Sequence, residues 1–248
     1  MKKSILILTL VVFSFAFLTA DVYIKQKVHT DAFEMMGQKT PAKDETTEQW
    51  IGKNKFAQIS GQQNLIIDLD KKKLFMVLHG SKSYIETDLP LDMSKLLPPQ
   101  AVQMMNMMKI DAKVNSTGET KKIGDWTCSG YDVAMNITGM MPITMNFKMW
   151  ASTDVPFDWK AFSEKMYPEV IKASMGRMMG IGEEIINEFK KIKGFQIATE
   201  MSMNMMGAQM KVTMEVVEIS NKPAPADAYL PPAGYAKKTQ LNPMDMQQ

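Results

Sequence analysis

Apolar residues occupy every second position of residues 141–150, MPITMNFKMW. Successive side chains of a β-strand point to opposite faces, so this alternation predicts a strand with one apolar face and one wet face. Strand faces are usually filled by β-branched and aromatic residues, whereas three of the ten residues here are methionine. The choice of methionine therefore needs a physical explanation.

Short apolar or alternating segments predict that the N-terminal half is rich in strands. We expect a long strand over residues 21–36, followed by a loop or irregular connection over the polar residues 37–54. Four further strands are expected over residues 55–60, 64–70, 73–79 and 83–89. Turn-like residues separate these four segments, which predicts an antiparallel meander joined by hairpins.

Three segments have the character of helices. Residues 98–109, PPQAVQMMNMMK, begin with two prolines, which a first helical turn tolerates. After Asp158, a predicted N-cap, apolar residues recur every three or four positions until Pro168 interrupts or restarts the helix. Residues 182–193, GEEIINEFKKIK, end in lysines before a glycine, as a helix C-terminus favours.

A second group of strands lies between and after these helices in the sequence and carries ten of the 26 methionines. These strands are expected over residues 111–117, 120–124, 125–137, 141–152, 195–206 and 209–219. In four of them the alternate positions are apolar and would form one wide, methionine-rich face. Strands with helical insertions that cover one face predict an α+β fold with a mainly antiparallel sheet.

The first twenty residues, MKKSILILTLVVFSFAFLTA, combine a basic start, a short apolar run and a small final residue. This pattern is typical of a secretory signal peptide, which we expect to be cleaved after Ala20. The apolar run is shorter than the roughly 20 residues that span a bilayer. The sequence therefore predicts a periplasmic or secreted protein.

Charge and cysteine content narrow the possible partners. Once the signal peptide is removed, basic and acidic residues balance, and Arg177 is the only arginine of the chain. Nucleic acid is therefore not an expected partner, because it needs clustered basic residues. Cys128 is the only cysteine, and we interpret it as a small buried residue of a strand.

Methionine side chains have three rotatable bonds and pack around many shapes, which suits a surface that accepts variable apolar guests. We therefore interpret the methionine-rich face as one wall of a cavity for acyl chains or similar ligands. The alternative is an ordinary core in a chain with biased composition.

The composition and motifs bear on three other functions. Thioethers suit Cu(I), so soft-metal binding is one alternative. A non-catalytic structural or interaction role in the envelope is another, and it predicts exposed methionines and a filled interior. An enzyme is not expected, because the chain has no GxSxG, HExxH or P-loop motif. No cofactor is expected.

Several short motifs resemble an uncharacterised family of exported bacterial proteins that shares the fold of the lipoprotein carriers LolA and LolB. The motifs are NLIIDLDKKKLFMV, SYIETD, ETKKIGDWTCSGYDV and PPAGYAKK. The resemblance implies a strongly bent antiparallel sheet, an incomplete barrel, with helices that cover its concave face. It implies a hydrophobic ligand class but no particular transport role.

Residue predictions follow from combining the methionine pattern with this resemblance. The sheet and its helical lid should occupy residues 21–222, and residues 223–248 should form a proline-rich tail that lies along the surface or is loose. We expect a monomer that binds a hydrophobic ligand or a lipidated protein, with transient contact with a membrane surface. The predicted ligand-binding residues are Met135, Met145, Phe147, Met149, Met201, Met203 and Met214 on the sheet and Met104, Met108 and Met178 on the helices.

Overall fold

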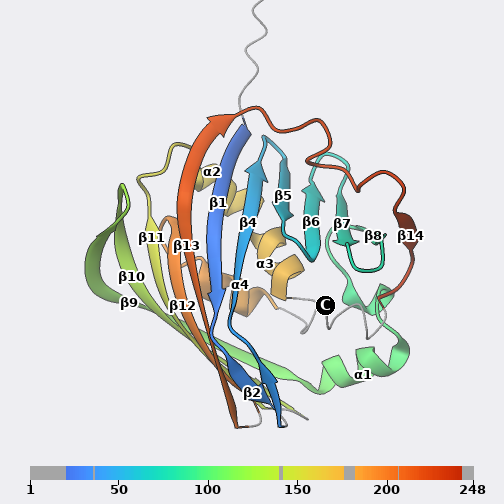
Figure 1. The fold of residues 1–248 in the computed structure, drawn as a ribbon, viewed down its shortest axis with the longest axis horizontal. Coiled ribbons are helices and arrows are strands. Elements are labelled where there is room, and N and C mark those ends of the chain that lie inside the picture. Colours follow the sequence, from blue (N-terminus) through green and yellow to red (C-terminus); the bar gives the residue numbers. More distant parts are fainter. Residues whose placement is uncertain (1–20, 36, 140–141, 176–181, 206, 242–248) are drawn as a thin grey trace, which may run out of the picture.

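One strand, β1 (Asp21–Thr30), joins two antiparallel meanders into a sheet of twelve strands (Figure 1). The first meander consists of β4 (Lys43–Ile51), β5 (Lys55–Ile59), β6 (Gln63–Asp68), β7 (Lys73–Leu78) and β8 (Ser83–Asp88). The second consists of β9 (Lys109–Ile123), β10 (Trp126–Thr138), β11 (Ile143–Ser152), β12 (Phe195–Met205) and β13 (Ala208–Lys222). Strand β1 pairs with β4 on one side and with β13 on the other. The predicted meander over residues 55–89 is confirmed.

The computed structural model describes residues 21–35, 37–139, 142–175, 182–205 and 207–241. The predicted signal peptide and Met178 lie outside these residues. A small hairpin, β2 (Phe33–Met35) with β3 (Gln38–Thr40), extends beyond the end of β1. Within the described ranges, no helix combines the length and the apolar character needed to cross a membrane.

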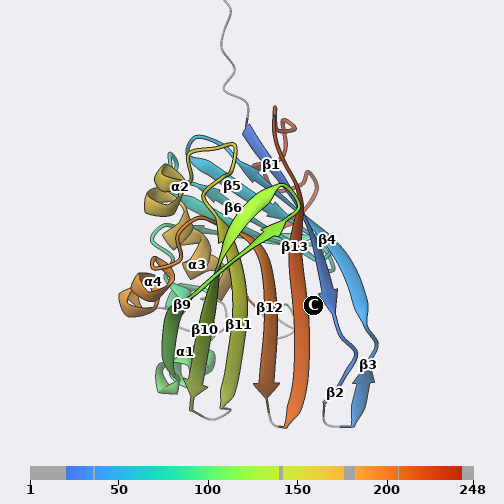
Figure 2. The ribbon, with the colours of Figure 1, turned by 90° about the vertical axis from the view of Figure 1, so that its left-hand side faces the viewer.

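The sheet is strongly curved and its two edge strands, β14 (Ala236–Lys238) and β9, do not pair with each other. The helices α2 (Trp159–Lys165), α3 (Tyr167–Met175) and α4 (Glu183–Phe189) lie together on one side of it (Figure 2). This confirms the predicted α+β class and the incomplete barrel with helices on its concave face. We call the helix-covered side of the sheet the inner face.

Local signals explain where the helices begin. Asp158 caps α2, because its carboxylate accepts a hydrogen bond of 2.9 Å from the backbone N–H of Ala161, as predicted. Pro168 lies in the first turn of α3, where its missing N–H is tolerated. Helix α1 (Pro99–Met107) likewise has a proline at its first position and follows a short 3₁₀ turn, Met93–Lys95. Helix α4 is shorter than predicted and ends at Phe189.

The loop predicted over residues 37–54 is wrong, because β3 and β4 occupy most of it. Strand β4 runs between β1 and β5, so its backbone groups are paired on both sides. Its polar side chains are exposed or only partly buried, whereas Trp50 and Ile51 are buried. The apolar alternation that predicts a strand is therefore present only at its end.

Residues 111–117 and 120–124, predicted as two strands, belong to one long strand, β9. Gly118 has φ of 73°, a left-handed conformation that glycine adopts without steric cost. The pairing register between β9 and β10 shifts next to it, between Ser129 and Tyr131. A bulge therefore bends the strand without ending it.

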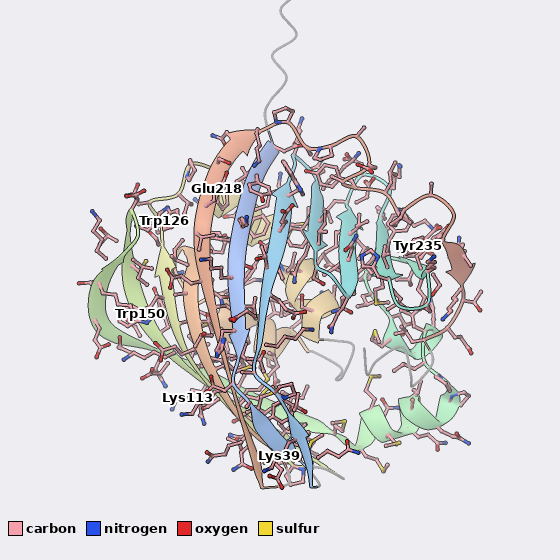
Figure 3. The ribbon with its side chains drawn as sticks, in the orientation of Figure 1. Lys39, Lys113, Trp126, Trp150, Glu218 and Tyr235 are labelled. Atoms are coloured by element: carbon pink, nitrogen blue, oxygen red, sulfur yellow. The ribbon has the colours of Figure 1, made fainter. Side chains whose placement is uncertain are left out.

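The described part of the C-terminal tail, up to Leu241, lies on the outer face of the first meander, and β14 is the only regular element within it. Ala228 is buried against Tyr23, Trp50 and neighbouring side chains of that face. The hydroxyl oxygen of Tyr235, labelled in Figure 3, is hydrogen-bonded to Nδ1 of His79 at 2.9 Å, and Nε2 of that ring is hydrogen-bonded to the Asn64 side-chain oxygen at 2.9 Å. The tail therefore packs on the sheet as part of the fold.

Leu241, the last described residue of the C-terminal tail, lies on the inner side of the sheet, beyond its edge strand β8. The Leu241 side chain is buried in the inner core with Met93, Leu96 and Leu97. Its backbone N–H donates a 2.8 Å hydrogen bond to the carbonyl oxygen of Leu96. Together with the parallel pairing of β14 to β8, this contact covers the edge strand β8, which would otherwise present unpaired backbone groups.

An ion pair joins the end of β1 to the start of β4, and its effect on a histidine pKa can be tested. His29 Nδ1 lies 2.7 Å from an oxygen of Asp44, and Nε2 lies 3.2 Å from Asp31. The hydrogen bond with Asp44 is the main cause that raises the pKa of His29 above its ordinary value. We expect Asp44→Asn to lower the pKa of His29, measured by NMR titration of the ring protons.

Asp31→Asn is the matched control and should lower the same pKa by less, because Asp31 contributes less to the shift. Folding favours the protonated ring, so the pair stabilises the chain below the ordinary histidine pKa of about 6.5 and loses this effect as the pH rises through the folded pKa. An equal response to the two substitutions would contradict this assignment.

Candidate ligand-binding site

Alternate residues of the second meander form rows across its inner face. The strand registers align residues of neighbouring strands into these rows. Odd-numbered residues of β10 pair with odd-numbered residues of β11, and these pair with odd-numbered residues of β12. Odd-numbered residues of β12 in turn pair with even-numbered residues of β13. The rows are Met135–Met145–Met203–Met210, Val133–Phe147–Met201–Val212 and Tyr131–Met149–Thr199–Met214. The predicted methionine-rich face of four strands is therefore confirmed as a single surface.

Burial falls from β10 to β13 along the row Met135–Met145–Met203–Met210. Met135 is 0% exposed and Met145 is 8% exposed, because both pack in one cluster with Ile171 of α3 and Ile185 of α4. Met203 packs against the same cluster but is only partly buried. Helices α3 and α4 thus cover β10 and β11 closely and leave the parts of β12 and β13 that carry Met203 and Met210 more open.

A cavity of about 300 Å³ lies between the inner face and the three helices. It is at the lower end of the roughly 300–1,000 Å³ range of ligand pockets. Strand residues that line it are Gln26, Gln49, Phe56, Gln58, Phe147, Met149, Phe195, Gln196 and Met214. Helix residues that line it are Trp159, Phe162, Tyr167, Val170, Ile171, Ser174 and Phe189. The two meanders therefore both contribute walls.

One side of the cavity is aromatic. Trp159, Phe162, Tyr167 and Phe195 form a cluster in which ring centroids lie 5.5–6.4 Å apart. Burial raises the pKa of Tyr167 to about 12, so its phenol stays neutral at physiological pH. The cluster offers a large apolar surface with fixed shape.

Another part of the lining is polar and carries no charge. The side-chain amide of Gln49 donates a 3.0 Å hydrogen bond to Oε1 of Gln26, which also accepts a 3.3 Å bond from the Thr47 hydroxyl. Gln58 lies directly opposite Gln49 on the neighbouring strand. The described lining residues include no charged side chain. The cavity can therefore hydrogen-bond a neutral polar group but cannot neutralise an ion.

The predicted site residues separate into groups. Phe147, Met149 and Met214 line the cavity. The predicted residues that lie elsewhere are Met135 and Met145 in the core, Met201 and Met203 half-buried on β12, Met108 partly buried after α1, and Met104, which is 45% exposed on α1. The aromatic residues of α2 and the glutamines of β1, β4 and β5 were not predicted. Polar residues at alternate positions of those strands, facing an apolar helix, are the signal that could have found them.

A larger groove, of about 1,080 Å³, lies on the outer face. Its lining mixes both signs of charge, from Lys27, Asp44, Lys121 and Glu215 among others. The end of β9 forms one wall, where Lys121 Nζ lies 4.1 Å from the ring centroid of Trp150, a residue labelled in Figure 3. Such a wet, charged groove suits apolar ligands less well than the inner cavity does.

Cys128 is fully buried in β10, as predicted. Burial raises the pKa of its thiol, which opposes the thiolate form that a nucleophile needs. Among the described residues, no group of three or more His, Cys, Asp or Glu side chains could hold a metal ion.

Comparison with known proteins gives a family and a weak structural similarity. The sequence model described as "Domain of unknown function (DUF4412)" matches residues 41–235. No curated protein matches the sequence. A solved structure of a candidate outer membrane lipoprotein-sorting protein domain from Vibrio parahaemolyticus is similar with a TM-score of 0.28 and 6% identity, over 84% of this chain and 89% of that chain. A similarity this low supports no conclusion about function.

Met135 and Met203 differ in burial, so truncating each to alanine should lower the free energy of unfolding by different amounts. Met135→Ala should lower the free energy of unfolding by about 2–5 kcal/mol, because it leaves a cavity in a closed core. Met203→Ala should cost less than about 2 kcal/mol, because its side chain is only partly buried. Urea denaturation of both variants checks this, and similar costs would contradict the described burial.

Proposed function

The chain belongs to the family described as "Domain of unknown function (DUF4412)", and we propose that it is a non-catalytic binding protein for the apolar chain of a lipid or a lipidated partner. The observation that carries this proposal is the cavity of about 300 Å³ between the inner face and α2–α4. Its aromatic and methionine lining provides the apolar contact, and the flexible thioethers of Met149 and Met214 suit chains of different shape.

The uncharged lining narrows the ligand class further. A carboxylate placed in this cavity would lose its hydration without gaining a cationic partner, which is costly. An ester or amide carbonyl would instead accept hydrogen bonds from the side-chain amides of Gln49 or Gln58. We therefore propose that the bound group is esterified or amide-linked, as in a membrane lipid or an acylated protein, and is not a free fatty acid.

A role as a carrier, in the periplasm or outside the cell, belongs to the same proposal. The predicted signal peptide would export the chain, and a LolA-like arrangement of sheet and helical lid would shield an acyl chain from water during transfer. Helix α1 adds two exposed methionines, Met104 and Met107, 45% and 56% exposed, which are available for transient contact with a membrane surface or a partner.

Filling the cavity should remove binding. Val170 of α3 lines the cavity, so Val170→Trp should weaken binding of the neutral fluorescent probe N-phenyl-1-naphthylamine at least tenfold through direct occlusion. Fluorescence titration of the purified protein measures this. Val217→Trp is the control, because Val217 is 42% exposed on the outer face and should leave the probe affinity unchanged.

Saturable probe binding that resists Val170→Trp would place the apolar site outside the cavity and contradict the proposal. Absence of any saturable binding in the wild-type protein would contradict it directly. That second outcome would favour the structural or interaction role, in which the interior serves only as core.

The choice between neutral and ionised ligands is a separate prediction. Methyl laurate should displace the probe at least tenfold more effectively than laurate at neutral pH, because only laurate must bury a charge. Competition titrations with the two compounds at equal free concentration check this. Equal or better displacement by laurate would show that the bound carboxylate has a partner and would reject an ester or amide ligand.

A further inference from the structure

Three methionines stand directly beside one another on adjacent strands of the inner face. Met145 of β11 is opposite Met203 of β12, and Met203 is opposite Met210 of β13. Directly opposite residues of antiparallel strands have Cβ atoms about 4.5–5.5 Å apart. Met side chains extend by three rotatable bonds from that position, so their three sulfur atoms can converge on one point above the central strand.

We propose that Met145, Met203 and Met210 form a thioether site for a soft monovalent ion, Cu(I) or Ag(I). Thioether sulfur is a soft and uncharged ligand that selects Cu(I) over the hard divalent ions. Three neutral ligands leave the charge of the ion at +1, which a partly apolar surface tolerates better than a divalent charge. We call these three residues the thioether row.

Access to solvent distinguishes the thioether row from the core beside it. Met135 continues the same row on β10 but is 0% exposed beneath the helices. Met145 is 8% exposed and would form the floor of the site, while Met203 and Met210 are only partly buried. An ion can therefore reach the row from the open side, over β12 and β13, without unfolding of the core.

The described neighbours of the row on this face offer no harder ligand. The positions before and after the row on the same face carry Ile143, Met205 and Ala208 on one side and Phe147, Met201 and Val212 on the other. None of these side chains can bind Zn²⁺, Mg²⁺ or Ca²⁺ in its usual coordination. The two histidines are engaged elsewhere, His29 with Asp31 and Asp44 and His79 with Asn64 and Tyr235.

The thioether row does not overlap with the lining of the inner cavity, which takes its methionines from Met149 and Met214. The ion site and the lipid site can therefore be tested separately. Val170→Trp should weaken probe binding at least tenfold and leave ion binding unchanged.

Anaerobic competition with bathocuproine disulfonate tests the site in the purified protein. We expect one Cu(I) per chain and at least a tenfold rise in Kd for the double variant Met203→Leu, Met210→Leu. Leucine keeps a similar volume and apolar character, so the fold should be retained, and circular dichroism checks this. Native mass spectrometry with Ag(I) should give the same stoichiometry.

The matched control is Met104→Leu, Met107→Leu, which removes two exposed methionines of α1 and should leave the Cu(I) affinity unchanged. X-ray absorption at the copper edge should show a first shell of sulfur alone. Absence of Cu(I) binding, an unchanged Kd in the double variant of the thioether row, or nitrogen ligands in the first shell would each overturn the proposal.

Discussion

The pairing of β1 with both β4 and β13 is the interaction on which the rest of the structure depends. Each meander is a set of local hairpins, but only β1 connects them into one curved sheet. The inner cavity needs both meanders, because Gln49 and Gln58 come from one and Phe147 and Met149 from the other. Strand β1 itself places Gln26 between them. The first strand after the predicted signal peptide therefore brings the walls of the candidate site together.

The methionine-rich inner face serves as core where the helices cover it and as an accessible surface where they do not. Where α3 and α4 pack closely, Met135 and Met145 are core residues that contribute to stability through complete burial. Where the helices leave the sheet, the methionines of β12 and β13 are only partly buried and can change rotamer at small cost. One row of thioethers thus passes from a structural region into a region that a ligand can reach.

The distribution of charge separates the two faces of the sheet. The inner cavity has an aromatic side and a neutral amide side, and its described lining carries no ion. The larger outer groove carries charges of both signs, which include His29 and its two carboxylate partners nearby. Because an unpaired charge is costly to bury, the inner face selects apolar and neutral polar groups. The size of a cavity alone would have pointed to the outer groove, so chemistry decides between them.

The sequence by itself determined the elements that have a strong local signal. Alternation over residues 143–149, hairpin spacing over residues 55–89, the Asp158 cap and the prolines that open α1 predicted their strands and helices, because each depends on near neighbours. Strand β4 was missed because its polar side chains are supported by pairing on both sides, which only the sheet supplies. The tertiary structure alone decided that Phe147, Met149 and Met214 face a cavity while Met135 and Met145 are core. All five share one apolar pattern, and their burial depends on where distant helices pack against the sheet.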